Sequence, residues 1–295
     1  MTNVIDFTEL NDYFASLDKP PSKSSQMAYK SQYKKIRTEI KKPLLTLPID
    51  EITEYLETIE QMNTKKNLLN IFVMLKRKDY PEDYEYLIAL RETYKDEINK
   101  VVMENNEKLE ATLPTFKQIE KHLRDSNGVD YIINYILFYY FVRSKDLDLI
   151  ITKELPEDEN SNYILINKDG KSVLYHRGNY KTVRTHGMKD HLIKEKKFVS
   201  TCLSLLGSKK SVKLLPFKQA DKAIRNSTYN GISESEHVKI LVHHYFNLKN
   251  INKLIKIGQT RGTNLNLVLK NYNLDYQLPK YDFKEDSDER EIQAD

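Results

Sequence analysis

The chain has little of what marks secreted, metal-binding or membrane-spanning proteins. Of its 295 residues only Cys202 is a cysteine, which excludes an internal disulfide and a cysteine-based zinc site. Cys202 stands in the apolar stretch 198–206 and is predicted to be a small buried side chain. Apolar runs such as 131–142 are too short and interrupted to span a bilayer, and no charged region precedes an apolar signal core. We therefore expect an intracellular protein without membrane contact.

Basic residues are scarce in the last segment of the chain, although the chain as a whole is basic. The formal net charge is +4, but residues 282–295 carry seven acids and two bases, so the rest of the chain is basic. Between Lys168 and Lys218 there are thirteen Lys or Arg and three Asp or Glu. Such an excess can neutralise phosphates, although a solvated lysine-rich surface would give the same count. The acidic segment 282–295 is predicted to be a disordered tail.

No repeat of the solenoid type is visible, and the length suggests two modest domains. The first hundred residues predict a bundle of short amphipathic helices separated by proline-bearing turns, for example at Pro20-Pro21, Pro48 and Pro81. We expect this N-terminal helical domain to cover residues 1–108. The polar segment 104–110 is predicted to be the linker that ends it.

The second domain is expected to cover residues 109–281. It opens on a capping box at Thr115 and Gln118 and continues into a strongly apolar helix, 129–142. The pattern then changes, with apolar runs at 163–166 and 172–175 and room for a third strand after Gly187. Helices resume to Tyr272. The predicted fold class is therefore mainly α with a small antiparallel β-sheet, that is, α+β.

The order of certain polar residues suggests phosphodiester chemistry. Breaking a phosphodiester without a metal needs a nucleophile, cationic groups on the nonbridging oxygens and an acid for the leaving oxygen. Arg143 ends the apolar helix, with Asp146 placed to orient its guanidinium, and Lys181 ends a predicted strand. Lys239 lies on a predicted helix, 235–245, and Tyr272 comes late in the chain. Taken singly, each residue is more simply explained as structural or as surface charge.

In this order the residues resemble the catalytic domain of the tyrosine recombinase (integrase) family. Arg143-Ser-Lys-Asp146-Leu147 resembles the family's first box, an Arg followed three residues later by an acid. Tyr180-Lys181-Thr182 is similar to the segment that carries the strand lysine. Gly262-Thr263 through Tyr272 resembles the third box, in which Gly-His is followed at this spacing by the nucleophile. The N-terminal helices resemble the core-binding domain with which the same enzymes hold DNA, so the resemblance implies that residues 1–108 bind DNA.

The sequence departs from the family's pattern in two boxes. The second box, His-x-x-Arg, stands here as Glu236-His237-Val238-Lys239, and Thr263 replaces the third-box His or Trp. A lysine supplies charge but cannot make the forked, two-pronged contact of an arginine, so we expect stabilisation of the phosphate oxygens by Lys239 to be weaker or to be shared with Arg261. The candidates for the missing imidazole are His237, His243 and His244.

The resemblance implies a site-specific DNA recombinase that needs no cofactor. Tyr272 would attack the scissile phosphate, form a 3′-phosphotyrosyl link and release a 5′-hydroxyl, while Arg143 and Lys239 hold the phosphate and Lys181 protonates the leaving oxygen. Tyr276 is a competing nucleophile by spacing alone. The implied partners are double-stranded DNA and further copies of the chain, which would assemble as a tetramer on DNA. The implied location is at DNA inside the cell, in the nucleus or in a viral or bacterial DNA compartment.

Three alternatives fit the same sequence. A type IB topoisomerase would use a similar set of groups as a monomer. A catalytically inactive DNA-binding protein would keep the fold and the basic surface, and the altered second box is compatible with it. A helical interaction protein that binds no nucleic acid would require the stretch 168–218 to be solubilising charge only.

Overall fold

The computed structural model describes residues 5–215 and 219–274. The predicted acidic tail and Tyr276 lie outside these ranges. The chain divides into two compact units, the first ending at Asn105 and the second beginning at Asn106. Both boundary residues lie in one long helix, so the segment 104–110 that was expected to be a linker is helical.

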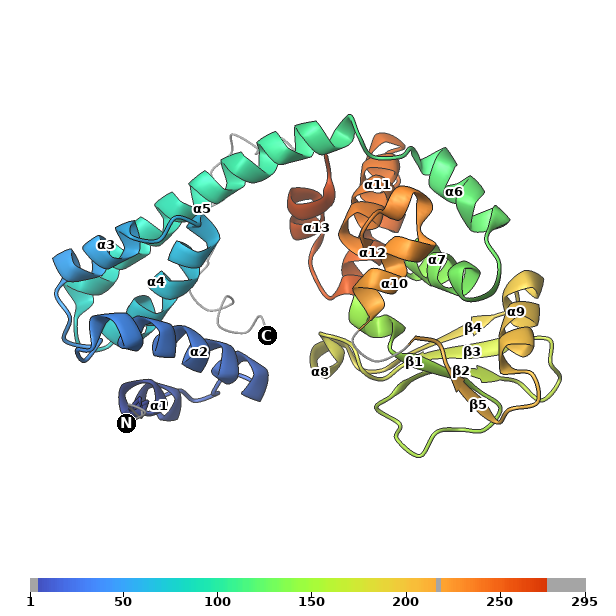
Figure 1. The fold of residues 1–295 in the computed structure, drawn as a ribbon, viewed down its shortest axis with the longest axis horizontal. Coiled ribbons are helices and arrows are strands. Elements are labelled where there is room, and N and C mark those ends of the chain that lie inside the picture. Colours follow the sequence, from blue (N-terminus) through green and yellow to red (C-terminus); the bar gives the residue numbers. More distant parts are fainter. Residues whose placement is uncertain (1–4, 216–218, 275–295) are drawn as a thin grey trace. The chain divides into compact units, whose positions relative to one another are not determined.

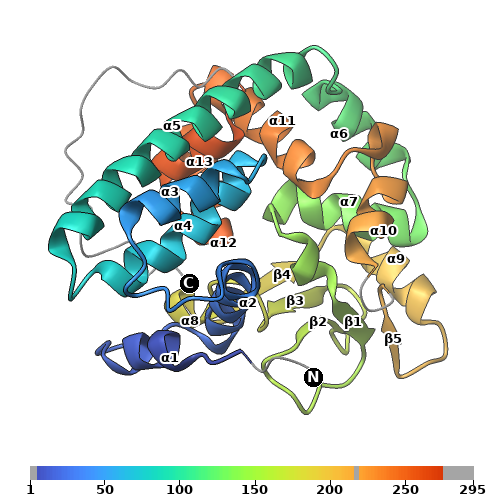
Figure 2. The ribbon, with the colours of Figure 1, turned by 60° about the vertical axis from the view of Figure 1, so that its left-hand side comes forward.

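The first unit is a helical bundle, drawn in blue to green in Figure 1. Its helices are α1 (Thr8–Ala15), α2 (Lys23–Ile40), α3 (Ile49–Glu57), α4 (Met62–Lys76) and α5 (Pro81–Glu110), of which α5 ends in the second unit. Helix α4 is the centre of the bundle, because α1, α2 and α3 all pack against it (Figure 2). Its buried residues Leu69, Ile71 and Phe72 belong to the core of this unit.

The second unit combines helices with one sheet (Figure 1). Its first half contains α6 (Phe116–Asp125), α7 (Gly128–Tyr140), the 3-10 helix η1 (Ser144–Leu147), β1 (Leu149–Thr152), β2 (Asn162–Ile166), β3 (Val173–Arg177), α8 (Val183–His186) and β4 (Lys189–Ile193). Its second half contains α9 (Lys196–Leu206), β5 (Ser211–Lys213), α10 (Ala220–Ser227), the 3-10 helix η2 (Tyr229–Gly231), α11 (Glu234–Asn247), α12 (Ile251–Arg261) and α13 (Leu265–Tyr272). The predicted capping box is confirmed at the start of α6.

The sheet has the strand order β4-β3-β2-β1-β5. The three predicted strands are confirmed as β2, β3 and β4, which pair antiparallel. The prediction of a purely antiparallel sheet is wrong, because β1 pairs with β2 in parallel and β5 adds an antiparallel edge. The α+β class holds, with a mixed sheet of five strands.

Helix α7 lies at the centre of the second unit's core. Its residues Ile132, Ile133, Ile136 and Leu137 are fully buried, as the apolar sequence predicts. Helix α9 packs against α7 and against β1, β2 and β5, and Cys202 on α9 is buried as expected. Burial of the sheet's inner face places the side chains of Tyr175 and Arg177, on β3, inside the molecule. In the part of the chain that the structure describes, no helix is both long and apolar enough to cross a membrane.

Candidate functional site

Tyr272 is the last residue of α13 and is half-buried. The turn before this helix is fixed at both ends: Gly262 ends α12 in the left-handed conformation, and the Asn264 side chain accepts a hydrogen bond from the Leu267 N–H at 2.8 Å. Arg261 Nη2 donates a hydrogen bond of 2.8 Å to the Tyr272 hydroxyl. Two residues that the sequence placed eleven apart are thus in direct contact through their functional groups.

Arg261 is held on several sides and is only 4 % exposed. Its Nη1 donates to the carbonyl oxygens of Phe141 and Val142, each at 3.3 Å, just beyond the end of α7. The guanidinium carbon also lies 4.8 Å from the centre of the Tyr272 ring. Because a guanidinium is planar, these contacts fix the direction in which Nη2 points.

Arg143 lies beside this pair at the start of η1. Phe141, two residues earlier, has φ of +51°, an uncommon conformation for a large side chain, and it turns the chain out of α7. Burial, followed by the positive charge of Arg261, lowers the pKa of Arg143, while Tyr272, Asp146 and Glu234 oppose that change. Among the residues described, its guanidinium makes no hydrogen bond, so its donors are available to a ligand.

Glu234, which the sequence did not single out, connects two of these segments. It is the first residue of α11, and its Oε2 accepts hydrogen bonds from the backbone N–H and the hydroxyl of Ser144, at 3.2 and 3.3 Å. Its Oε1 forms an ion pair of 2.6 Å with Arg261 Nη1. An acid in the first turn of a helix is usually explained by the helix dipole, so the sequence held no signal for this role.

A second buried ion pair lies at the end of β3. Arg177 Nη2 donates to Asp146 Oδ2 at 2.6 Å, and each of the two side chains is at most 2 % exposed. The same oxygen accepts from the Arg143 backbone N–H at 3.2 Å, so Asp146 positions the Arg143 backbone and not, as expected, its guanidinium. Burial raises the pKa of Asp146, and the Arg177 charge opposes that rise.

Arg177 keeps donor atoms without a partner. Its Nε and Nη1 are buried and lack a hydrogen-bond partner within the described ranges, as does Arg261 Nε. The carboxylate oxygens Asp146 Oδ1 and Glu234 Oε1 lack a hydrogen-bond partner in the same way, so the buried cluster holds unpaired donors and unpaired acceptors together.

The two lysines near the site lie between the end of β3 and the start of β4. Lys181 is exposed and follows β3 in a turn, four residues beyond the strand's end, so it is not on a strand as expected. Its neighbour Thr182 lies against Gly262, where an added Cβ would come within 2.0 Å of the threonine hydroxyl. Lys189 begins β4 and donates to the Gln259 carbonyl at 2.8 Å. Burial, reinforced by Arg177, lowers the pKa of Lys189.

The second-box residues have contacts of their own and none is with Tyr272, among the residues described. Lys239 Nζ donates to Asn106 Oδ1 at 2.6 Å, and His237 is 1 % exposed and lies edge-on to Phe138. Burial lowers the pKa of His237 to about 4, so its imidazole is neutral near pH 7. Each helical residue turns by about 100°, so Lys239, five residues after Glu234, points about 140° away from it.

The other candidate histidines on α11 also have partners of their own. The His244 ring is stacked on Phe116, with ring centres 3.6 Å apart. His243 Nε2 lies 3.0 Å from the side-chain nitrogen of Asn247. Of the sequence-predicted residues, the structure therefore joins Arg143, Arg261 and Tyr272 and does not join His237 or Lys239 to them.

Residues 5–215 and 219–274 contain no cluster of three His, Cys, Asp or Glu side chains suited to a metal ion. The described site is instead built from guanidinium groups, carboxylates and a phenol. Comparisons with family models, with curated proteins and with solved structures give no match to this chain.

Proposed function

We propose that this protein cuts and rejoins double-stranded DNA as a tyrosine recombinase does, with Tyr272 as the nucleophile. The single observation that carries the proposal is the hydrogen bond from Arg261 Nη2 to the Tyr272 hydroxyl, with Arg143 beside the pair. A phenol next to two guanidinium groups offers a nucleophile together with donors for the phosphate oxygens. These residues come from segments that resemble the first and third boxes of the family.

In the proposed reaction the Tyr272 oxygen attacks phosphorus and the 5′ oxygen leaves. The phenolic proton goes to solvent, and Lys181, or Lys189 near it, supplies a proton to the leaving oxygen. Arg143 would hold a nonbridging oxygen with its free donors, and Arg261 would orient the phenol. The phosphotyrosyl ester keeps the energy of the phosphodiester, so rejoining reverses the same steps without a cofactor.

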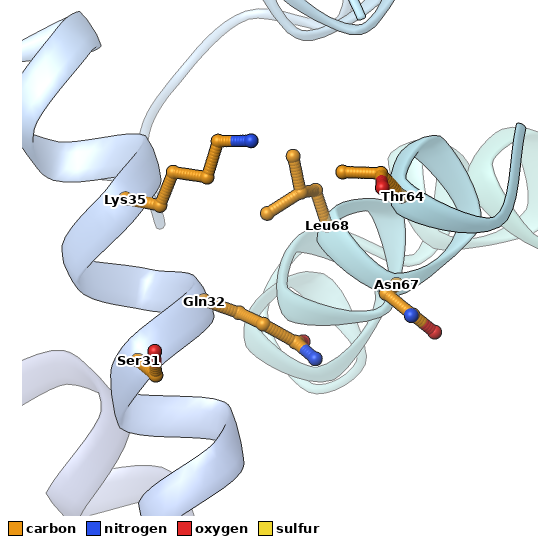
Figure 3. A pocket seen from close by; sticks show the side chains of 6 residues that line it. All are labelled: Ser31, Gln32, Lys35, Thr64, Asn67 and Leu68. Atoms are coloured by element: carbon orange, nitrogen blue, oxygen red, sulfur yellow. The ribbon is translucent and has the colours of Figure 1, made fainter. Parts of the chain in front are cut away.

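Features of the first unit support DNA as the partner. Helix α2 carries five basic residues and one acid. Helix α4 adds Lys65 and Lys66, while its third lysine, Lys76, is buried and paired with Asp83. Between these helices is a pocket of about 180 Å³ lined by Ser31, Gln32, Lys35, Thr64, Asn67 and Leu68. Figure 3 shows Gln32 and Lys35 reaching from α2 toward α4. The pocket is smaller than the roughly 300 to 1,000 Å³ usual for small-molecule sites. The lysines of α2 and α4 could neutralise phosphates, and for that reason we favour a polynucleotide on this surface. Assembly as a tetramer on DNA is part of the same proposal.

A second candidate is a DNA-binding protein of the same fold that does not cut DNA. The observation that favours it is the position of the histidines on α11, since His237 is buried against Phe138 and His244 is stacked on Phe116. A type IB topoisomerase would use the same chemistry and is separated from a recombinase by its products.

The deciding experiment incubates the protein with nicked suicide DNA substrates and analyses the products on denaturing gels. We expect a covalent protein–DNA adduct that maps to the peptide containing Tyr272 and is absent in Tyr272→Phe. Phenylalanine keeps the ring, so the variant tests the hydroxyl alone. The matched control is Tyr139→Phe, because Tyr139 is 43 % exposed and lies in the same unit. It should form the adduct normally.

Each other result has a definite meaning. An adduct that persists in Tyr272→Phe and maps to Tyr276 would refute the nucleophile but keep the enzyme class. If DNA is bound without any adduct on cleavable substrates, the DNA-binding alternative replaces the proposal.

A further inference from the structure

Glu234 lies closer to Arg261, the residue that contacts the proposed nucleophile, than the other described partners of that arginine. The ion pair measures 2.6 Å, and the two side chains are 15 % and 4 % exposed. The two carbonyl contacts to the same nitrogen are both 3.3 Å long. This contact is an ion pair and not a hydrogen bond, since Glu234 Oε1 has no hydrogen-bond partner among the described residues. The carboxylate is nevertheless a close negative charge on the Arg261 guanidinium, and in a buried site that attraction is strong.

The two terminal nitrogens of the Arg261 guanidinium have separate partners. Nη1 meets Glu234 and the carbonyls that end α7, whereas Nη2 meets the Tyr272 hydroxyl. Rotation of the fork about its own axis would break both sets of contacts together. The other carboxylate oxygen of Glu234 is tied to Ser144, next to Arg143. The position of Nη2 is thus linked, through one carboxylate, to the segment that carries the first box.

We propose that Glu234 is a positioning residue that holds Arg261 on the Tyr272 oxygen and ties it to the segment of Arg143. This inference rests on the proposed function, since it assigns Glu234 to the transfer at Tyr272. Glu234 would not touch the DNA. It would act through the Arg261 fork, whose displacement by about 1 Å can cost roughly 100-fold in rate.

The first experiment needs no DNA. Tyrosine labelled with ¹³C at Cζ gives one NMR signal per residue, and the Tyr272 signal is identified by its loss in Tyr272→Phe. We expect this signal to move in Arg261→Ala, to move in the same direction in Glu234→Ala, and to move no further in the double variant. The control is Glu236→Ala, which removes a carboxylate from the same helical turn, where it bonds to Ser233 and not to Arg261.

The second experiment measures cleavage rate and DNA affinity for the same variants. We expect Glu234→Ala to slow adduct formation about 100-fold with affinity unchanged within about twofold. Added to Arg261→Ala, it should have almost no further effect, because residues that act as a unit are not additive. Glu234→Gln keeps the shape and an acceptor oxygen and should recover part of the rate; it also serves if Glu234→Ala does not fold.

The two proposals fail in different ways. If the wild-type protein forms no adduct on any substrate but the NMR changes occur as expected, the proposed function is refuted. The NMR changes would still show that Glu234 positions Arg261 against Tyr272. If the wild-type protein cleaves but Glu234→Ala and Glu234→Gln cleave at its rate or faster, the inference is overturned. Additive losses in the double variant, or equal losses in Glu236→Ala, would overturn it as well.

Discussion

Gly262 is the residue at which a single methyl group should do most damage to the site's framework. Its φ is +63°, where an L-residue costs about 1 to 2 kcal/mol. An added Cβ would also lie 2.0 Å from Oγ1 and 2.5 Å from both carbons of the Thr182 side chain. Thr182 is β-branched and stiff, so relieving the overlap by moving backbone should cost about 1 to 3 kcal/mol more. Gly262→Ala should therefore lower the free energy of unfolding by about 2 to 5 kcal/mol.

Gly170 provides the matched control, because its φ is also +63° and nothing lies within 4 Å of its added Cβ. Gly170→Ala should lower the free energy of unfolding only by the cost of the positive φ, about 1 to 2 kcal/mol. Unfolding of the second unit is followed in urea by hydrogen exchange of peptides from β2 and β3. Adding Thr182→Gly to Gly262→Ala removes the side chain that the new methyl group overlaps. The double variant should therefore recover most of the free energy of unfolding that the overlap costs. Equal losses for the two alanine variants, or no recovery in the double variant, would refute this close packing of Thr182 on Gly262.

Two further predictions concern titration and proton transfer. Burial lowers the folded-state pKa of His237 to about 4, below the unfolded value of about 6.5, so acid favours the unfolded state. The free energy of unfolding should therefore fall as the pH drops from about 6.5, by about 3 kcal/mol at pH 4. Measured by urea unfolding, this free energy should depend less on pH in His237→Leu than in the wild type or in the control His186→Gln. The same pH dependence in His237→Leu and the wild type would contradict a neutral buried imidazole. Lys181→Ala should slow cleavage by about 10²-fold or more and be rescued on a 5′-bridging phosphorothiolate, whose leaving group needs no acid. Rescue of Lys189→Ala instead, measured in the same gel assay, would assign the acid to Lys189.

The local parts of the fold were predictable because their signals are local. The capping box at Thr115 and Gln118 marks the start of α6, and an unbroken apolar run predicts the buried α7. Strand β1 was missed because a short apolar run has no period that separates strand from helix. Strand β5 has only three residues. The parallel pairing of β1 with β2 is not fixed by any turn, so the sequence pattern could not reveal it.

The site was predictable only where spacing along the chain determines position. Tyr272 and Arg261 lie on either side of one short turn, and their contact follows from it. Lys239 and His237 were chosen by distance from Tyr272 in sequence, but the rotation of α11 decides which side chains reach the site, and Glu234 contacts Arg261. Arg177 was missed because its partner Asp146 is thirty-one residues away.

The three arginines of the cluster, Arg143, Arg177 and Arg261, differ in whether a carboxylate neutralises them. Arg177 is neutralised by Asp146 and Arg261 by Glu234, whereas Arg143 makes no ion pair within the described part of the chain. The excess positive charge of the cluster is therefore carried by Arg143, and a phosphodiester brings one negative charge to meet it. In the proposed reaction Arg143 would therefore be the phosphate ligand, and Arg261, with its charge already paired, would orient the phenol. A site divided in this way would not require a cation at Lys239, because Arg143 would already match the phosphate charge, and Lys239 bonds to Asn106 instead.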